Sequence, residues 1–325
     1  MTEPSTPPSG PLLDASQTAA RLPFPALADE IERLLQDPSV AVPPRLIQSL
    51  PGGASLFVMP AHDARVAIVK LITFTPANAG TARATIQGDV IVFDVATGSR
   101  RLLLDGPTVT ARRTAAVTLL AARRLAPNPR GPLLIVGAGV QGRAHLEAFA
   151  AGLPVREVRI ASRSRRSADA LAEHARSLGI VATVVADADA ALAECPLAIT
   201  CTPANGVVLS GEPPADAFIA AVGAFTPRMV ELAPALCRRM ASHGRIVLDA
   251  ADARHEAGDL LQAGLDTARL QTLAEVIGNT VAPNTGASAN APVLFKNCGW
   301  AGWDLAAARL ALRNDPSGQH PSDSP

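Results

Sequence analysis

The chain has 325 residues, and its 29 basic side chains balance its 29 acidic side chains, which gives a formal net charge of zero. This balance argues against a surface that binds nucleic acid or an anionic membrane, and no apolar run is long enough to span a bilayer. The length suits about two domains. The four cysteines show neither metal-ligand nor disulfide spacing, so we expect a cytoplasmic protein without a bound metal.

The two ends of the chain are rich in Pro and Ser. Residues 1–11 lack the basic flank and apolar core of a signal peptide, and residues 314–325 have a similar composition. Both segments predict disordered tails.

The region from residue 12 to residue 128 predicts a mixed α+β domain. Helices are indicated at 27–35 and 110–125. Between them, alternating or apolar segments separated by Gly, Pro, Asn and Asp are typical of a mostly antiparallel sheet. These segments lie at 54–59, 67–74, 84–93 and 101–104. A last amphipathic helix at 300–312 is expected to return to this domain, which then comprises residues 12–128 with 296–313.

A glycine-rich turn follows the apolar residues Leu133–Val136 and precedes a helical stretch. Gly137 permits the tight turn, Gly139 lets a pyrophosphate approach the backbone, and Gly142 lets the helix pack closely on the strand. The amides and the positive dipole end of the helix would then face the phosphates. The alternative is a glycine-rich turn in an ordinary α/β unit, but the strand before it and the helix after it favour dinucleotide binding.

Further short apolar strands are indicated at 155–161, 180–185, 197–202, 217–222 and 245–249. Because helical patterns separate them, they predict a parallel sheet covered on both faces, so residues 129–295 form a doubly wound Rossmann domain of the α/β class. The ligand of such a sheet lies at the carboxyl ends of the strands. This rule places Ser162, Thr202, Pro203 and Gly223–Phe225 on one rim.

The end of the strand at 155–161 bears on the choice of cofactor. An NAD-binding protein usually carries Asp or Glu there, which binds the ribose hydroxyls. This chain instead reads Ala161-Ser-Arg-Ser-Arg-Arg166. Ser162 and Ser164 can donate hydrogen bonds, and Arg163 can lie against the adenine or pair with a 2′-phosphate. Arg165 and Arg166 add positive charge that suits a phosphate, so NADPH is favoured and NADH is the alternative. The alternative is a solvated basic helix start, which the helix dipole would disfavour without a nearby anion.

Several motifs occur in the order seen in one protein family. They are Arg45, Lys70–Phe74, Asp94–Gly98, Arg113–Ala116, the glycine turn with Gln141, and Ala221–Ala224. Together they resemble the ornithine cyclodeaminase/μ-crystallin family from about residue 12 to residue 312. The resemblance implies a homodimer whose chains each have a substrate and dimerisation domain and a Rossmann domain. It also implies that Arg45, Lys70 and Arg113 face the nicotinamide and hold a substrate carboxylate, with Lys70 as the catalytic residue.

The glycine turn, the strand ends and the family motifs together indicate which residues bind the cofactor. They are Thr85, Arg113, Thr114, Gly137, Gly139, Val140, Gln141, Gly142, Ser162, Arg163, Arg166, Thr202, Pro203, Val222, Gly223 and Phe225. Two residues have a plainer interpretation. Lys70 lies among apolar residues, where a lysine of a half-buried strand can snorkel to the surface. Arg113 follows Arg112, and the pair could be a solvated helix start, although the pattern Arg113-Thr114 matches the family.

One position departs from the family pattern. Cyclodeaminases carry a catalytic aspartate at the position of Phe225, and a phenyl ring can neither accept a proton nor steer an ammonium group. We therefore expect ornithine cyclisation to be lost. Gly223–Phe225 and Lys296–Trp303 resemble the bacterial Δ1-pyrroline-2-carboxylate reductases of this family.

That resemblance implies NADPH-dependent reduction of the cyclic imino acids Δ1-pyrroline-2-carboxylate and Δ1-piperideine-2-carboxylate to L-proline and L-pipecolate. Reductive amination of a 2-oxo acid, as in alanine dehydrogenases of the family, is the alternative reaction. A μ-crystallin-like protein that binds NADPH and ligand without turnover is the alternative of another class. The sequence leaves the preferred ring size open, and it assigns no role to His145 or Cys298.

Overall fold

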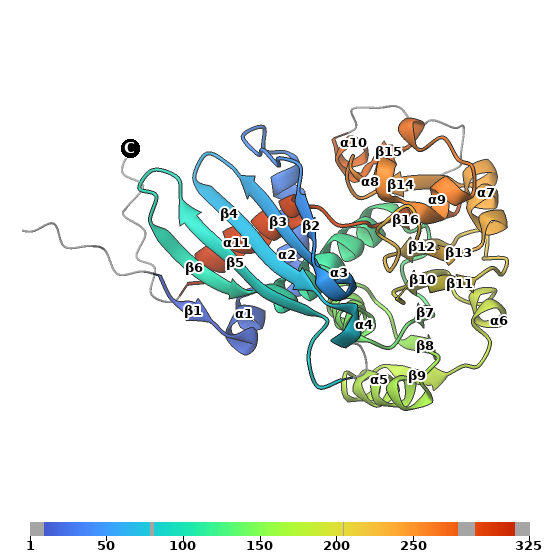
Figure 1. Cartoon of the computed structure of the whole chain (residues 1–325). Coiled ribbons are helices and arrows are strands. Elements are labelled where there is room, and N and C mark those ends of the chain that lie inside the picture. Colours follow the sequence, from blue (N-terminus) through green and yellow to red (C-terminus); the bar gives the residue numbers. More distant parts are fainter. Residues whose placement is uncertain (1–9, 79–80, 204, 279–289, 316–325) are drawn as a thin grey trace, which may run out of the picture. The chain divides into compact units, whose positions relative to one another are not determined.

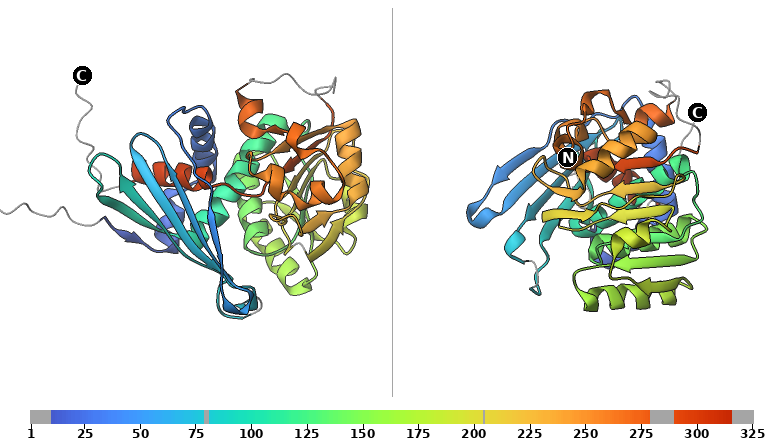
Figure 2. Two further views of the ribbon diagram at one scale, coloured as in Figure 1. Left: turned by 45° about the horizontal axis from the view of Figure 1, so that its top comes forward. Right: turned by 90° about the vertical axis from the view of Figure 1, so that its right-hand side faces the viewer.

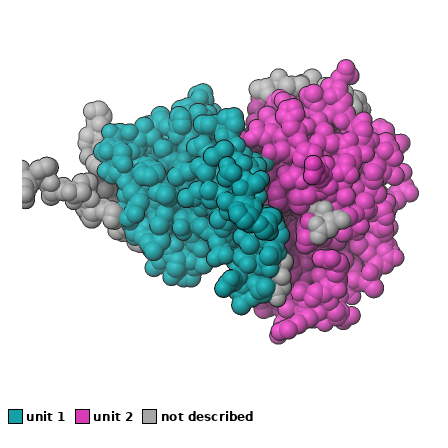
Figure 3. Space-filling model, in the orientation of Figure 1, with its two compact units in different colours: residues 1–113, 301–325 teal, residues 114–300 magenta. Residues whose placement is uncertain are grey.

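The computed structural model describes residues 10–78, 81–203, 205–278 and 290–315. The chain forms two compact units, which Figure 3 distinguishes by colour: unit 1 comprises residues 1–113 with 301–325, and unit 2 comprises residues 114–300. Of the tails expected at the two ends, residues 1–9 and 316–325 lie outside the described residues. The described ends are bonded to unit 1, since Gly10 N donates to Arg100 O (3.0 Å) and Asp315 pairs with Arg21 (3.1 Å).

Unit 1 contains a six-stranded sheet in the order β1-β6-β5-β4-β3-β2. Its strands are β1 (Leu12–Leu13), β2 (Leu46–Ser49), β3 (Ser55–His62), β4 (Val66–Phe74), β5 (Ile86–Asp94) and β6 (Arg100–Asp105). Neighbouring strands are antiparallel except β1 and β6, which are parallel. The remaining elements are α1 (Ala15–Arg21), α2 (Phe24–Leu35), the start of α3 (Gly106–Leu125), α11 (Ala301–Arg313) and the short turns η1 (Pro51–Gly53) and η2 (Pro76–Asn78).

One face of the unit 1 sheet is covered by α11, which packs against α2, β3 and β4 (Figure 1, Figure 2). Because side chains alternate along a strand, every second residue faces this helix. The buried residues of this face include Met59, Ile68, Ile72 and Val90. The helix itself is buried over nearly its whole length, including Trp303. The C-terminal helix is therefore part of the core of unit 1.

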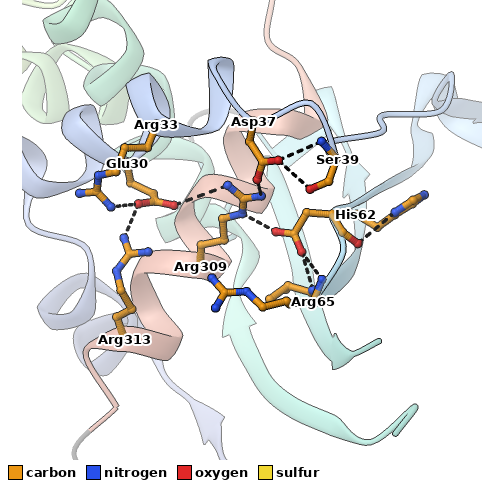
Figure 4. Close-up of polar contacts among 10 residues, drawn as sticks. Glu30, Arg33, Asp37, Ser39, His62, Arg65, Arg309 and Arg313 are labelled. Carbon is orange, nitrogen blue, oxygen red and sulfur yellow. Dashed lines mark hydrogen bonds and ion pairs between the residues drawn. The ribbon is translucent and has the colours of Figure 1, made fainter. Parts of the chain in front are cut away.

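An ion-pair network fixes α11 within unit 1 (Figure 4). Arg309 of α11 pairs with Asp37, which follows α2, and with Asp63, which lies in the turn between β3 and β4. Glu30 of α2 is buried and pairs with Arg313. Charges removed from water in this way must keep their partners, so the network fixes the position of α11 along the sheet.

Unit 2 contains an eight-stranded, wholly parallel sheet in the order β15-β14-β16-β12-β10-β7-β8-β9. Its strands are β7 (Leu133–Val136), β8 (Glu157–Ala161), β9 (Val181–Val184), β10 (Leu197–Thr200), β12 (Phe218–Ala221), β14 (Arg245–Leu248), β15 (Gln271–Thr272) and β16 (Val293–Lys296). All residues of β7, β10, β12 and β16 are buried. Nearly continuous apolar strands suit a sheet that is covered on both faces, and this confirms the expected doubly wound α/β fold.

Helices flank the unit 2 sheet on both sides (Figure 2). They are the rest of α3, α4 (Val140–Gly152), α5 (Arg165–Ser177), α6 (Ala188–Leu192), α7 (Pro234–His243), α8 (Ala253–Glu256), α9 (Gly258–Gln262), the turn η3 (Thr267–Arg269) and α10 (Leu273–Ile277). A two-stranded ribbon of β11 (Asn205–Leu209) and β13 (Val230–Leu232) joins them, and the sequence had not indicated it. Strand order reverses between β7 and β10, which is where a doubly wound sheet binds its ligand.

Candidate functional site

The three glycines of the turn between β7 and α4 meet different steric demands. Gly137 has φ +115°, and a Cβ there would lie 2.7 Å from Cys201 O. A Cβ on Gly142 would lie only 2.0 Å from Gly137 O, so the helix could not pack at this distance with a side chain. A Cβ on Gly139 would meet no atom within 4 Å. Gly137 and Gly142 therefore serve the packing of the turn, whereas Gly139 borders open space.

The amino end of α4 is suited to bind an anion. Gly139 is its N-cap residue, and no side chain caps the helix there. Val140, the first helical residue, is 73% exposed. The first amides of the helix thus remain available to a phosphate, and the helix dipole favours negative charge at this end. These features fit the pyrophosphate of a dinucleotide.

The predicted rim residues of unit 2 follow four neighbouring strands, β8, β7, β10 and β12. Gly137 N donates to Ala161 O (2.9 Å), and Val222 N donates to Thr200 O (2.9 Å). Thr202 and Gly223 lie two residues beyond the ends of β10 and β12, and Pro203 is exposed. Because these strands are parallel, their carboxyl ends lie along one edge of the sheet.

The turn between β8 and α5 carries the basic residues considered for cofactor choice. Ser164 caps α5 and accepts from Ser167 N (3.2 Å), while Arg165 pairs with Asp169 (2.9 Å). Arg163 and Arg166 are exposed, and within the described part of the chain neither forms an ion pair. Two cationic side chains at this strand end are therefore available to an anion.

A second set of predicted residues comes together inside unit 1. Lys70 lies in the middle of β4 and is 1% exposed, which rules out the interpretation as a snorkelling surface lysine. Its Nζ lies 3.1 Å from Asp304 Oδ1 of α11. Arg113 of α3 is also buried, and its Nε lies 3.3 Å from the same carboxylate oxygen. We call Lys70, Arg113 and Asp304 the cation cluster.

The environment of Lys70 brings its pKa near neutrality. Burial lowers the pKa to about 8 from the ordinary value of 10.5, since it penalises the charged form. The carboxylate of Asp304 opposes this effect, whereas the positive charges of Arg113 and Arg45 add to it. Arg45 precedes β2 and is half-buried. Lys70 is therefore protonated at pH 7 but close to its pKa, as suits a residue that exchanges a proton.

The cation cluster has two cations for one carboxylate, and atoms on both sides, Asp304 Oδ2 among them, are buried without a hydrogen-bond partner in the described residues. Arg113 Nη1 is buried and has no hydrogen-bond partner in the described residues. A buried donor without a partner is costly, and a planar guanidinium suits a carboxylate. An anionic ligand would satisfy this spare donor.

Asp304 is the residue of the cation cluster that the sequence did not reveal. It lies in the first turn of α11, is fully buried, and is separated from Lys70 by 234 positions in the sequence. The available signal was an acidic residue on an otherwise apolar helix face. A carboxylate there had to have a buried cation as its partner.

Other residues named from the sequence have varied environments. Thr85 is half-buried and its carbonyl accepts from Thr75 N (2.8 Å). The carbonyl of Thr114 accepts from the Thr118 hydroxyl (3.0 Å). Phe225 is half-buried and packs against the core of unit 2.

The residues to which the sequence assigned no role are buried in unit 2. His145 is fully buried and contacts Gln141 O, and burial raises the pKa of the Cys298 thiol, so that the thiol is not a ready nucleophile. Within the described ranges, no group of His, Cys, Asp and Glu side chains is arranged to hold a metal ion. No helix among them is long and apolar enough to cross a membrane.

Two curated relatives are similar over most of their length. Delta(1)-pyrroline-2-carboxylate reductase 1 of Burkholderia multivorans is 38% identical, over 93% of this chain and 94% of the relative. The Delta(1)-pyrroline-2-carboxylate/Delta(1)-piperideine-2-carboxylate reductase of Azospirillum brasilense is 35% identical, also over 93% of this chain and 94% of the relative.

A solved structure has the same fold. The Delta(1)-pyrroline-2-carboxylate reductase of Thermococcus litoralis, in complex with NADH and L-proline, superimposes with a TM-score of 0.84 at 24% identity, covering 92% of this chain and 95% of that one. The model of the ornithine cyclodeaminase/mu-crystallin family matches residues 15–317. The chain therefore belongs to the ornithine cyclodeaminase/μ-crystallin family, as the sequence motifs predicted.

Proposed function

We propose that this protein reduces cyclic ketimine carboxylates, namely Δ1-pyrroline-2-carboxylate and Δ1-piperideine-2-carboxylate, to L-proline and L-pipecolate. The observation that carries the proposal is the buried cation cluster, in which Lys70 and Arg113 share the single carboxylate of Asp304. Its surplus positive charge suits a small ligand with one carboxylate. The names of the Burkholderia and Azospirillum relatives support the same substrate class.

Each part of the reaction falls to particular residues. When bound, a reduced nicotinamide supplies the hydride that adds to C2 of the imine. Arg45 and Arg113 bind the substrate carboxylate and orient the C=N bond. Lys70 is protonated below its pKa of about 8, and it donates a proton to the imine nitrogen, which becomes the amine of the product. Solvent then returns a proton to Lys70.

For the cofactor we propose NADPH, held by the glycine turn and by the basic turn after β8. Arg163 and Arg166 are free of ion pairs among the described residues, and Ser162 is close to them in the chain. No carboxylate lies between Ser162 and Arg166 to bind a ribose hydroxyl or to repel a 2′-phosphate. This arrangement favours NADPH over NADH.

The test is an assay of NADPH oxidation with the purified protein and four substrates. We expect turnover with the two cyclic ketimines, and no release of ammonia from ornithine because Phe225 cannot act as a base. Faster turnover with pyruvate and ammonia would favour the alanine dehydrogenase reaction instead. Tight NADPH binding without turnover of any imine would favour a μ-crystallin-like binding protein, and rapid conversion of ornithine to proline would refute the proposal.

We also propose that the protein is a homodimer joined through the face of the unit 1 sheet opposite α11. Leu71 points to this face and is 42% exposed, and Leu46 of β2 is 59% exposed. Both are paired with Val58 of β3, so they form an apolar row across three strands. An apolar row of this kind on a sheet face is typical of a protein interface.

Light scattering on the full chain tests the dimer. We expect the mass of two chains for the unsubstituted protein and of one chain for Leu71→Lys, because a buried charge without a partner disfavours the interface. Leu178, next to α5 in unit 2, is equally exposed at 42%, so Leu178→Lys is the matched control and should remain dimeric. If the Leu71→Lys variant is dimeric, this face of the sheet is not the dimer interface.

A further inference from the structure

A buried carboxylate joins two loops of the nucleotide rim in unit 2. Glu231 of β13 is fully buried, and its Oε2 accepts from Thr200 Oγ1 (2.9 Å) and Gly223 N (2.7 Å). Its Oε1 accepts from Thr202 N (2.6 Å) and Thr202 Oγ1 (2.8 Å). Thr202 follows β10 and Gly223 follows β12, and these strands are neighbours. One side chain therefore fixes two adjacent strand ends.

The loops around Glu231 leave no space for a side chain at Gly223. A Cβ on Gly223 would lie 2.2 Å from Thr202 O and 2.5 Å from Glu231 Oε1. The glycine is required by this close approach of the two loops to the carboxylate. Any displacement of Glu231 would therefore be transmitted directly to both backbones.

Two further buried charges hold the backbone of Glu231 itself. Asp259 Oδ1 accepts from Glu231 N (2.6 Å) and from Leu232 N (2.9 Å). Lys296 of β16 lies with its Nζ 2.8 Å from Asp259 Oδ2, and it also donates to Ala221 O at the end of β12 (3.3 Å). Glu231 and Lys296 thus both contact the end of β12, at Gly223 and Ala221 respectively. Buried charges are a poor source of stability compared with apolar packing, so exact placement of the backbone explains this cluster better than stability does.

The loops that Glu231 joins lie at the half of the rim away from the adenosine-binding end. In a doubly wound sheet the pyrophosphate lies at the first βα turn and the adenosine ribose at the end of the next strand in the sheet. Here these positions are the glycine turn after β7 and the turn after β8. The ends of β10 and β12, on the other side of β7, are left for the nicotinamide half.

We propose that Glu231 is a positioning residue, which sets the backbones of Thr202–Pro203 and Gly223–Phe225 for the nicotinamide end of the cofactor. The proposal rests on the dinucleotide dependence of the proposed function. The two carboxylate oxygens of Glu231 each accept from one loop amide. A glutamine side chain cannot do the same, since its nitrogen only donates. The charge of Glu231 is therefore needed, as well as its shape.

The first test compares Glu231→Gln with Thr200→Val. The glutamine variant loses one of the two loop contacts, and we expect the Kd and KM for NADPH to rise about tenfold or more. Thr200→Val removes a donor to the same carboxylate but leaves both loop amides in place, so its Kd should stay within about twofold even if its Tm falls. A Glu231→Gln variant that melts at lower temperature but binds NADPH like the unsubstituted protein would show that Glu231 has only a structural role.

Hydrogen exchange on the unsubstituted protein gives a second test, which does not depend on how well a variant folds. Addition of NADPH should slow exchange together in the peptides that contain Thr202 and Gly223, because one carboxylate holds both amides. Slowing in only one of the two peptides would refute the link. Both tests measure cofactor binding, so a failure to reduce imines would overturn the proposed substrate without affecting this result.

Discussion

The two units contain buried charge clusters that are satisfied to different degrees. In unit 1, Lys70 and Arg113 share the carboxylate of Asp304, and a buried nitrogen of Arg113 keeps no hydrogen-bond partner among the described residues. In unit 2, both oxygens of Glu231 are filled by donors of the protein itself. A cluster with spare donors is prepared for a ligand, whereas a satisfied one holds the backbone in place.

The difference also separates chemistry from cofactor placement. The cation cluster contains a lysine whose pKa burial lowers to about 8, so its proton is exchangeable near neutral pH. Glu231 takes no part in proton transfer in the proposed mechanism and acts through the loop amides that it accepts from. Substitutions of Lys70 should therefore change mainly kcat, whereas substitutions of Glu231 should change mainly the Kd and KM for NADPH.

The largest effect is expected for Lys70→Met. Loss of the proton donor should lower kcat with the cyclic ketimines by roughly a hundred- to ten-thousandfold. The affinity for NADPH should stay within a few-fold, because Lys70 belongs to unit 1 and the glycine turn belongs to unit 2. Steady-state kinetics and a fluorescence titration with NADPH measure the two quantities separately.

Arg45→Met is the comparison for that variant. It removes a carboxylate contact that is present in the ground state and in the transition state, so it should act mainly through the KM for the imine. Near-normal kinetics of Lys70→Met would show that Lys70 is not a catalytic residue. Equal loss of kcat in both variants would show that binding and proton transfer are not divided between them as proposed.

The next largest effect is expected for Asp304→Asn. The aspartate raises the pKa of Lys70, so its removal should lower that pKa below about 8. An acid with a lower pKa loses its proton at lower pH, and the alkaline limb of kcat/KM should move in that direction, with about a tenfold loss above pH 8. Activity at pH 6 should be affected least. If kcat/KM falls equally at every pH and its alkaline limb stays at the same pH, Asp304 does not have this role.

How far the sequence predicted these features depends on how local each one is. The glycine turn and the strands β7, β8, β10, β12 and β14 have signals within a few residues. Strand β7 has the predicted bounds, and the other four are shorter than predicted by one or two residues. Strand β16 (Val293–Lys296) is as long as β7 and β10, but the sequence did not indicate it. Its place between β12 and β14 is a tertiary property.

The sequence indicated the two basic members of the cation cluster, but it did not indicate the buried acidic residues Asp304 and Glu231. Lys70 and Arg113 were found by family motifs, but alternation alone could not distinguish a buried lysine from an exposed one. Asp304 and Glu231 act on partners from other elements, and their local sequences resemble any acidic residue near a helix or strand. Only the fold brings α11 against β4 and β13 against the ends of β10 and β12.

Cofactor choice gives a more selective effect, which should appear in the KM for only one of the two cofactors. Arg163→Ala should raise the KM for NADPH by about ten- to a hundredfold, because it removes a charge-assisted contact to the 2′-phosphate, and NADH kinetics should change little. Arg165→Ala is the matched control, since Arg165 is also exposed but already pairs with Asp169 at 2.9 Å. A preference of the unsubstituted protein for NADH, or an equal effect of both substitutions, would contradict this assignment.

The smallest effect on activity is expected at His145, where the change should appear in stability. The imidazole is fully buried between α4 and α3, with Nδ1 donating to Gln141 O (2.8 Å) and Nε2 3.1 Å from the hydroxyl of Thr118. Burial lowers its pKa to about 4 from the ordinary 6.5. The unfolded chain therefore binds a proton between these two pH values that the folded chain does not, and the free energy of unfolding must fall as the pH falls.

This contribution amounts to about 1.4 kcal/mol for each pH unit in that window. Gln cannot titrate, so the free energy of unfolding of His145→Gln should fall less steeply between pH 6.5 and pH 4 than that of the unsubstituted protein. Urea unfolding at several pH values, followed by circular dichroism, measures both slopes. Above pH 7 the histidine is neutral in both states, and the difference between the two proteins should be constant there. Parallel slopes across the acid window would mean that His145 is protonated in the folded protein, and its place in the core would then need another explanation.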